Sequence, residues 1–273
     1  MKRKLKRLQP PRNGIQYIVH PETREELSPF VFFDARTMHR HDEGLHIGMH
    51  PHSGIGILTY FNGGELLHED TGGNNDTIRE GGIQWIRAGG GVWHEEHYQK
   101  KPSVQSDSWP LTIHQLWLQL PPELEESSVE YQNIRPENLP IIDNVKVIAG
   151  TYKKIKSPLK VPFEMTYLDV VLEAGEHFTF SSPASQKTGF IFPRIGDIHL
   201  HGEKIPLGNL GILESNDGEL LIEANSHSRF VLITTLPQKL PKVVQGGSMH
   251  TSKEAMKRSL DRIQKLQFGS KIF

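Results

Sequence analysis

HPHSGIGILTYFNGGELLHEDTGGNNDTIREGGIQWIRAGGGVWHEE, residues 50–96, alternates short apolar runs with clusters of glycine and asparagine. Apolar runs of this length, separated by turn-forming residues, are typical of β-strands. Asn62-Gly63-Gly64 supplies the positive φ angles of a tight hairpin, and Glu80-Gly81-Gly82 comes just before the next predicted strand, residues 83–88. This stretch therefore predicts antiparallel β structure.

A second β-rich region follows residues 121–140, a stretch rich in Pro, Glu and Ser that we expect to connect two domains. It includes MTYLDVVLEAG at residues 165–175 and SRFVLITTL at residues 228–236. A chain of 273 residues is long enough for two domains of ordinary size. We predict an all-β protein with an N-terminal metal-binding domain over residues 1–133 and a C-terminal domain over residues 134–273.

The C-terminal residues are the part of the chain that predicts a helix most strongly. Thr251 and Glu254 have the spacing of a capping box. Apolar residues then recur at helical spacing: Met256, Leu260 and Ile263. We expect this apolar stripe to pack on the β domains, with a helix that binds a partner protein as the alternative.

Charge and composition exclude several classes of protein. The chain has 31 Lys and Arg against 32 Asp and Glu, so it has no general field that would attract nucleic acid or an anionic membrane. Because it contains no cysteine, any metal must be held by nitrogen and oxygen ligands. No apolar run reaches membrane-spanning length, and we expect a cytoplasmic protein. The basic residues 1–12 could form an arm for nucleic acid, but we favour a solvated terminal strand.

Two pairs of polar residues have the spacing of metal ligands on β-strands. His50 and His52 are two residues apart, as are His94 and Glu96, so each pair would point to one face of its strand. Three imidazole nitrogens and one carboxylate oxygen suit a borderline divalent metal and leave positions open for water, dioxygen or substrate. His199-Leu200-His201 has the same spacing without an H-x-E pair, and we read it as structural.

The same alternation predicts which other residues surround the site. If the strand continued through residue 60, four further residues would face the metal and leave room for a cavity: Gly54, Gly56, Leu58 and Tyr60. His68 and Asp70 form another polar pair, suited to the cavity rim or to contacts with the ligands.

The quoted stretch resembles the N-terminal signature of the pirin family nearly throughout. An HPH strand, a hairpin into an H-x-D strand, a strand containing QW, an AG-G turn and H-x-E follow one another in the family's order. SPFVFFD at residues 28–34 and HQLWLQLPP at residues 114–122 are also similar to pirin segments. The close resemblance covers residues 28–122, and the second half of the chain matches more loosely.

This resemblance implies a bicupin, with two jelly-roll cupin β-barrels in tandem and the C-terminal α-helix packed on them. It implies that the N-terminal barrel binds one divalent metal, foremost Fe(II), through His50, His52, His94 and Glu96. The C-terminal barrel is expected to lack a metal. Mn, Ni, Cu and Zn are alternatives that the same nitrogen and oxygen ligands would accept.

Some pirins have quercetin 2,3-dioxygenase activity, and others are described as redox-responsive transcriptional co-regulators. We therefore expect a metal-dependent dioxygenase that takes a flavonol or similar small aromatic substrate together with dioxygen, with Glu96 as its catalytic base. The alternative is a non-enzymatic regulator whose metal reports redox state to a protein partner, without direct contact to nucleic acid or membrane. Another cupin reaction, such as isomerisation, would need only the same metal and pocket.

One position departs from the family pattern. Many pirins and cupins have a glutamate shortly after the second histidine, where this chain has Gly56. Because that carboxylate is absent, the catalytic interpretation depends on Glu96.

Overall fold

The computed structural model describes residues 1–39, 44–99 and 110–269, and the chain divides into two compact units. We call one the histidine unit, which comprises Ile18–His20, Ser28–Pro136 and Lys239–Phe273. We call the other the second unit, which comprises Met1–Tyr17, Pro21–Leu27 and Glu137–Gln238. The predicted boundary after residue 133 lies near the change of unit at residues 136–137, but each end of the chain joins the opposite half. That residues 1–133 and 134–273 form two separate domains stays a prediction.

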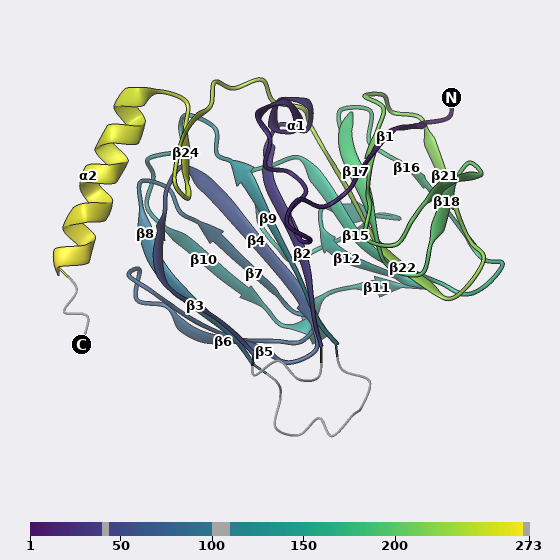
Figure 1. Cartoon of the computed structure of the whole chain (residues 1–273), viewed down its shortest axis with the longest axis horizontal. Coiled ribbons are helices and arrows are strands. Elements are labelled where there is room, and N and C mark those ends of the chain that lie inside the picture. The colour runs from purple at the N-terminus through teal and green to yellow at the C-terminus, as the bar shows by residue number, and fades with distance from the viewer. Residues whose placement is uncertain (40–43, 100–109, 270–273) are drawn as a thin grey trace. The chain divides into compact units, whose positions relative to one another are not determined.

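A larger and a smaller antiparallel sheet form most of the described part of the histidine unit (Figure 1). The larger sheet has, in spatial order, β10 (Glu130–Ile134), β7 (Ile83–Arg87), β4 (Ile55–Asn62), β9 (Pro110–Gln119) and β2 (Phe30–His39). The smaller sheet has β3 (Leu45–His52), β8 (Val92–Gln99), β5 (Glu65–Asp70) and β6 (Asn75–Arg79). The stretch that we expected to be a connection, residues 121–140, thus contributes strand β10 to this unit.

The chain turns sharply between β3 and β4, which belong to different sheets. Gly54 has a φ of +69°, and a side chain there would collide with the carbonyl oxygen of Met249. Only glycine fits both demands, because other residues rarely adopt this backbone conformation. HPHSGIGILTYF is therefore two strands with a corner, and not the single strand that the sequence predicted.

The second unit also combines a larger and a smaller antiparallel sheet among its described residues. The larger sheet has, in spatial order, β1 (Leu5–Gln9), β20 (Leu210–Leu213), β17 (Thr188–Ile195), β22 (Ser228–Thr235), β15 (Met165–Leu172), β12 (Val145–Ala149) and β11 (Ile141–Ile142). The smaller sheet has β16 (His177–Ser181), β21 (Glu219–Ala224), β18 (Ile198–Leu200) and β19 (Glu203–Ile205). The shorter elements are β13 (Thr151–Tyr152), β14 (Ile155–Lys156), α1 (Pro21–Glu26) and, at the change of unit, the 3-10 helix η1 (Pro136–Asn138). The basic N-terminus supplies β1, which confirms the expected terminal strand, but Arg3 just before it is fully buried and not solvated.

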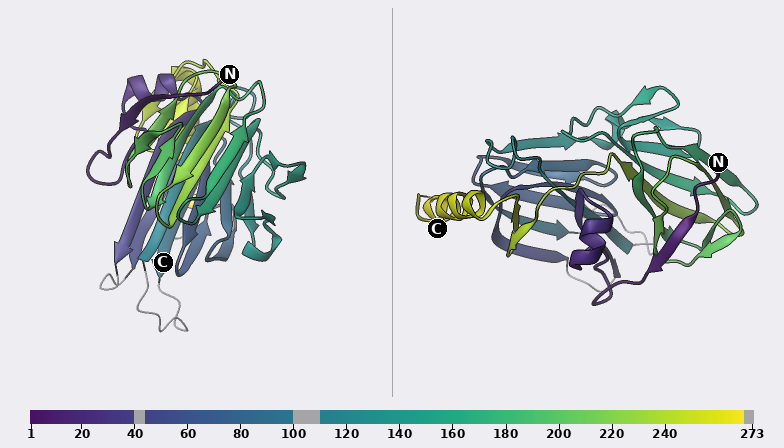
Figure 2. Two further views of the ribbon diagram at one scale, coloured as in Figure 1. Left: turned by 90° about the vertical axis from the view of Figure 1, so that its right-hand side faces the viewer. Right: turned by 90° about the horizontal axis from the view of Figure 1, so that it is seen from above.

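The C-terminal segment forms a hairpin and a helix on the histidine unit. The hairpin consists of β23 (Val243–Gln245) and β24 (Ser248–His250), and helix α2 (Lys253–Gly269) follows it. Figure 2, seen from above, shows this yellow segment beside the blue strands of the histidine unit. On the predicted apolar stripe, Met256 and Ile263 are buried. The expected packing face of the helix is therefore present.

The start of α2 differs by one residue from the predicted capping box. Ser252 Oγ accepts a hydrogen bond of 3.1 Å from the backbone N–H of Ala255, so Ser252 caps the helix. Thr251 instead donates its backbone N–H and its hydroxyl to the carboxylate of Glu125, at 2.6 and 2.7 Å. Because Thr251 binds the distant Glu125, the next residue, Ser252, caps the helix in its place.

The fold class is the predicted one, an all-β architecture with a C-terminal helix. Across the described ranges, no helix has the length and apolar character needed to cross a membrane.

Candidate metal centre

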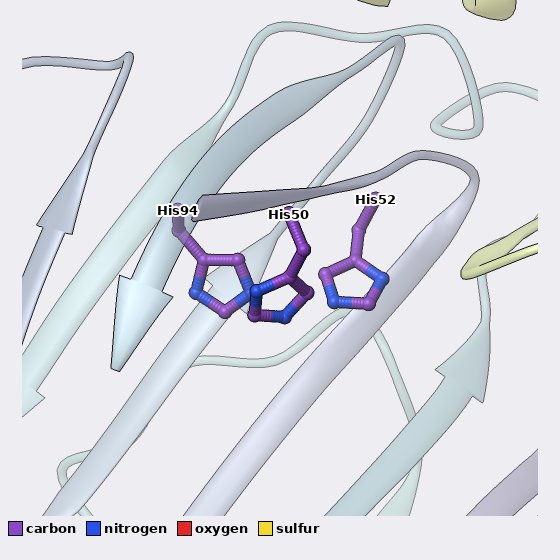
Figure 3. Close-up of side chains that lie close together, drawn as sticks. All are labelled: His50, His52 and His94. Atoms are coloured by element: carbon purple, nitrogen blue, oxygen red, sulfur yellow. The ribbon is translucent and has the colours of Figure 1, made fainter. Parts of the chain in front are cut away.

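The antiparallel pairing of β3 with β8 brings three histidines together. His50 lies directly opposite His94 in the ladder, and their ring centroids are 4.3 Å apart. The ring of His52 lies 4.9 Å from that of His50 and 5.1 Å from that of His94. One ring nitrogen from each residue lies within 4.8 Å of the other two. Figure 3 shows the three rings projecting to the same side of the strands.

Hydrogen bonds to backbone carbonyls settle the tautomer of two of these rings. His50 Nδ1 lies 2.8 Å from the carbonyl oxygen of Gly48, and His52 Nδ1 lies 2.7 Å from that of Gly247. A carbonyl only accepts, so Nδ1 must donate in each case, and Nε2 keeps its lone pair. Both residues can therefore offer Nε2 to a metal.

His94 is the fully buried member of the group on β8. In the described part of the chain, neither of its ring nitrogens has a hydrogen-bond partner. An unsatisfied buried imidazole is costly unless a further group binds it, and metal ligation is one way to satisfy it. The donor set thus fits a divalent metal bound through nitrogen.

Burial also keeps these imidazoles neutral, which is the form that binds metals. Desolvation lowers the pKa of His50, and it lowers the pKa of His52 to about 4. Desolvation, followed by the neighbouring imidazoles, lowers the pKa of His94 well below its ordinary value. All three rings are therefore neutral at neutral pH.

Glu96 lies two residues beyond His94 on β8 and is fully buried. Its carboxylate oxygens accept hydrogen bonds of 3.3 and 3.2 Å from Gln115 Nε2, and the Tyr98 hydroxyl lies 3.4 Å from Oε1. Desolvation raises the pKa of Glu96 to about 7, although hydrogen bonds from Gln115 and Tyr98 act to lower it. Among the described residues, the mutually close group consists of the three imidazoles without Glu96. The role of Glu96 as a fourth ligand stays a prediction.

His68 and Asp70 lie on β5, beside the histidine group. Asp70 lies opposite His94 in the ladder, and the ring centroids of His68 and His94 are 5.5 Å apart. His68 Nε2 lies 3.0 Å from Asp70 Oδ2, and Asn74 donates to both carboxylate oxygens of Asp70. Burial acts to raise the pKa of Asp70, but these hydrogen bonds hold it below its usual value. The pair therefore lies next to the histidine group, and its role at the site stays a prediction.

Strand β4 presents a different face to the histidines from the one we expected. On the neighbouring strand β9, Gln115 donates to the buried carboxylate, and the ring of Trp117 lies 4.8 Å from the ring of His52. Thr59 and Ile57 lie opposite these two residues in the β4–β9 register. Residues opposite one another in an antiparallel pair share a face, so Thr59 and Ile57 face the histidines.

The predicted pocket residues Gly56, Leu58 and Tyr60 therefore lie on the opposite face of β4, and Gly54 forms the corner. Alternation along a strand cannot be counted across a turn, which is why the sequence predicted the wrong face. A side chain at Gly56 would also collide with the indole of Trp85, so this position provides no open space. A glutamate at position 56, where many pirins and cupins have one, would also point away from these histidines.

Sequence reasoning missed Gln115, Trp117 and Phe32. The ring of Phe32 lies 4.3 Å from that of Trp117, so two aromatic rings extend from His52 along β9 and β2. The indole N–H of Trp117 donates to Gln115 Oε1 at 3.0 Å. The alternation in HQLWLQL, which places Gln115 and Trp117 on one face, was the available signal.

Known proteins resemble this chain in sequence and in fold. Residues 12–118 match the family model described as Pirin. A pirin-like protein from Arabidopsis thaliana is 29% identical over 236 residues, which cover 81% of this chain and 74% of the relative. A solved structure of quercetin 2,3-dioxygenase from Acinetobacter baumannii has a TM-score of 0.86 at 24% identity and covers 99% of both chains.

A second solved structure is that of the bacterial pirin YhhW in complex with nickel(II) from Escherichia coli. It has a TM-score of 0.62 at 22% identity and covers 81% of this chain and 87% of its own. Both structures share the two-barrel fold of this chain. The match of residues 12–118 to the Pirin model, the curated relative at 29% identity and the shared fold show that this chain is similar to pirins in sequence and in fold.

Proposed function

We propose that this pirin-like chain is a metal-dependent dioxygenase of the quercetin 2,3-dioxygenase type. Its metal would be held by His50, His52 and His94, with Glu96 as the fourth ligand. The observation that carries the proposal is His94, a fully buried imidazole without a hydrogen-bond partner among the described residues, close to two rings whose Nε2 atoms keep their lone pairs. When bound, a divalent metal there would act as a Lewis acid toward a substrate oxygen.

The acid–base chemistry of the chain would lie in Glu96. Because burial raises its pKa to about 7, this carboxyl can accept or release a proton near neutral pH. The amide of Gln115 donates to both carboxylate oxygens and so fixes their direction. In this proposal Glu96 accepts the proton of the substrate's enolic hydroxyl when its carboxylate is free of the metal.

The aromatic rings beside the histidines support a flat substrate. Trp117 is half-buried, and its ring lies 4.8 Å from the ring of His52 and 4.3 Å from that of Phe32. Aromatic faces of this kind favour stacking with another ring. A flavonol is a flat aromatic of this kind, and its oxidation is the activity for which the Acinetobacter protein is named.

We propose Fe(II) as the resident metal, with Mn, Ni, Cu or Zn as alternatives. Neutral imidazoles together with a carboxylate suit Fe(II), and the nickel(II) complex of the bacterial pirin is a precedent for another divalent ion in the family.

The test combines metal analysis of the purified protein with oxygen uptake on quercetin. We expect about one transition metal per chain and oxygen uptake that disappears together with the metal in His94→Ala. His199→Ala, in the second unit, is the matched control and should change neither quantity. Oxygen uptake that persists in metal-free His94→Ala would contradict the proposal, and a metal without any uptake would favour the regulatory alternative.

A further inference from the structure

The C-terminal hairpin of the histidine unit lies against the end of β3, next to His52. Ser248 forms an isolated parallel bridge with Ser53, and the backbone N–H of Met249 donates to the Ser53 carbonyl at 3.0 Å. The Met249 side chain packs into an apolar cluster with Ile55 and Ile57 of β4. A segment some 200 positions later in the sequence therefore lies directly on the corner after the HPH strand.

Gly247 makes the closest approach to a candidate ligand. Its carbonyl accepts the Nδ1–H of His52 at 2.7 Å. A side chain at position 247 would place its Cβ 2.7 Å from His52 Nδ1 and 2.8 Å from Cε1. Distances below 3 Å require something to move, so glycine is needed for this hydrogen bond to form with the ring where it is.

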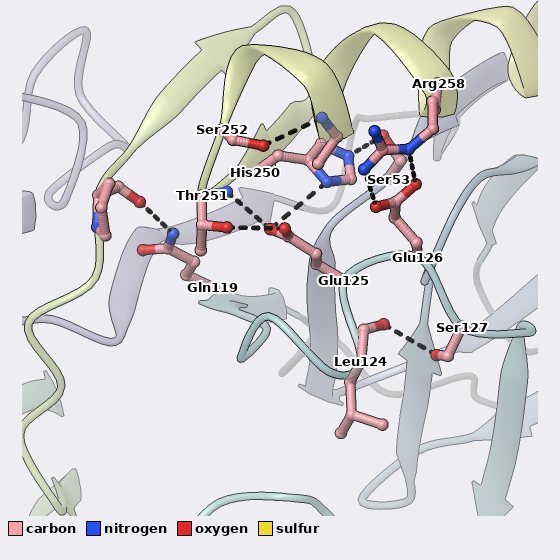
Figure 4. Close-up of polar contacts among 12 residues, drawn as sticks. Ser53, Gln119, Leu124, Glu125, Glu126, Ser127, His250, Thr251, Ser252 and Arg258 are labelled. Carbon is pink, nitrogen blue, oxygen red and sulfur yellow. Dashed lines mark hydrogen bonds and ion pairs between the residues drawn. The ribbon is translucent and has the colours of Figure 1, made fainter.

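A buried polar contact anchors the hairpin at its other end (Figure 4). His250 is fully buried, with Nε2 2.9 Å from Ser53 Oγ and Nδ1 3.6 Å from Glu125 Oε2. The Glu125 carboxylate also accepts the backbone N–H and the hydroxyl of Thr251. These contacts fix the last residue of β24 and the residue after it relative to Ser53 and Glu125.

Helix α2 extends this attachment to β8. The indole N–H of Trp93, the neighbour of His94, donates to the carbonyl of Ile263 at 2.9 Å. On the surface, Arg258 pairs with Glu126 at 2.6 Å. The C-terminal segment thus contacts residues adjacent to the candidate ligands on both β3 and β8.

We propose that this segment is part of the metal centre: the Gly247 carbonyl, held in place by His250, fixes the tautomer and direction of His52. Gly247 and His250 are then positioning residues, because they act through His52 and not on the metal. The inference rests on the proposed function of the site. A ligand imidazole whose second nitrogen is held in this way binds metal more tightly, and loss of such a contact typically costs about 10–100-fold in affinity.

The decisive comparison is between two glycines whose carbonyls accept from candidate ligands. Gly247→Ala would push a Cβ into the His52 ring, whereas Gly48→Ala, beside His50, would place its Cβ in open space. We expect Gly247→Ala to weaken Ni(II) binding about 10–100-fold, and Gly48→Ala to change it less than about threefold. Affinity is measured by competition with a chromogenic chelator.

A second readout reports positioning without any metal. Nitrogen-15 NMR of histidine rings in the metal-free protein should show His52 as a single Nδ1–H tautomer in the wild type and in Gly48→Ala. Gly247→Ala should lose this signature. If Gly247→Ala does not fold, His250→Gln is measured in its place. We expect this variant to lose about tenfold in Ni(II) affinity and to show a mixture of His52 tautomers.

The two proposals fail in distinguishable ways. A wild type that binds no Ni(II) and contains no other transition metal contradicts the proposed function, while the tautomer measurement still tests the role of Gly247. A folded Gly247→Ala, or His250→Gln in its place, with wild-type affinity and an unchanged His52 tautomer would overturn the inference.

Discussion

The two units have similar layers but different interiors. Each combines a larger and a smaller antiparallel sheet in its described residues. In the second unit the core is an apolar cluster that includes Phe178, Phe180 and Phe230. In the histidine unit, the inner faces of β3 and β8 instead carry imidazoles and a carboxylate. The histidine unit has apolar clusters as well, so one architecture can add a polar site to its packed core through a few inward positions.

Two H-x-H sequences, one in each unit, illustrate the difference between the units. His50 and His52 both lie within β3, so alternation brings them to one face. In the second unit, β18 ends at Leu200, and His201 follows in a turn with a φ of +51°. His201 Nε2 contacts the Glu219 carbonyl at 2.9 Å. The spacing of two residues therefore predicts a shared face only where both residues belong to one strand.

The largest expected effect is loss of the metal from the histidine unit. His94→Ala removes the fully buried imidazole of the group, and we expect it to abolish stoichiometric binding of a divalent metal. His199→Ala removes a histidine from the second unit and should leave binding unchanged. Metal content by mass spectrometry checks both variants. Equal loss of metal in His94→Ala and His199→Ala would mean that metal binding is not confined to the histidine unit.

The second prediction concerns the packed interior of the second unit. Phe230 is fully buried and lies 6.0 Å from Phe178 between ring centroids. Phe230→Ala should lower the free energy of unfolding by about 3–5 kcal/mol, because it leaves a cavity. Urea unfolding measures this loss, and metal affinity should remain within about twofold of the wild type. A large drop in affinity would show that the site depends on the core of the second unit.

The third prediction concerns pH and the buried carboxyl of the histidine unit. Burial raises the pKa of Glu96 to about 7 from an ordinary value of 4.5, so the folded chain favours its protonated form. The resulting stabilisation is fully present below about pH 4.5 and is lost as the pH rises through about 7. The difference corresponds to at most about 3 kcal/mol. Metal-free wild type should therefore lose this contribution between about pH 5 and about pH 7.5.

Glu96→Gln isolates this contribution, because glutamine does not titrate. His52 affects the free energy of unfolding in the opposite direction. Its pKa is lowered to about 4, so the stability that its neutral form contributes is present above about pH 6.5 and is lost as the pH falls toward about 4. Subtracting the unfolding free energies of the variant from those of the wild type cancels that term. A wild type and variant whose difference is independent of pH would show that Glu96 titrates normally.

Local alternation was enough to predict the grouping of histidines and the all-β fold. His50, His52 and His94 lie within regular strands, where the period of two holds. The face of β4 could not be predicted, because the corner at Gly54 is set by the distant Met249. The roles of Gly247 and Glu125 were equally hidden, since both depend on contacts between segments far apart in the chain. Sequence patterns report short-range geometry, and these features arise from long-range packing.

The smallest expected effect concerns Gln115, which contacts the candidate base without being a ligand. Gln115 Nε2 donates to both oxygens of Glu96, and its Oε1 accepts from the Trp117 indole. Gln115→Leu keeps the approximate volume but removes the amide. We expect about a tenfold loss of oxygen uptake on quercetin, because Glu96 loses the group that orients it.

A matched variant tells orientation apart from general damage. Gln132→Leu removes another half-buried amide of the same unit, one that donates to Glu130 at 2.8 Å, and should leave oxygen uptake unchanged. The pH profile adds a readout that a purely structural role would not move. Hydrogen bonds from Gln115 act to lower the pKa of Glu96, so their removal should move the acidic limb of the profile to higher pH. A tenfold loss at an unchanged pH profile would mean that Gln115 supports the site only by packing.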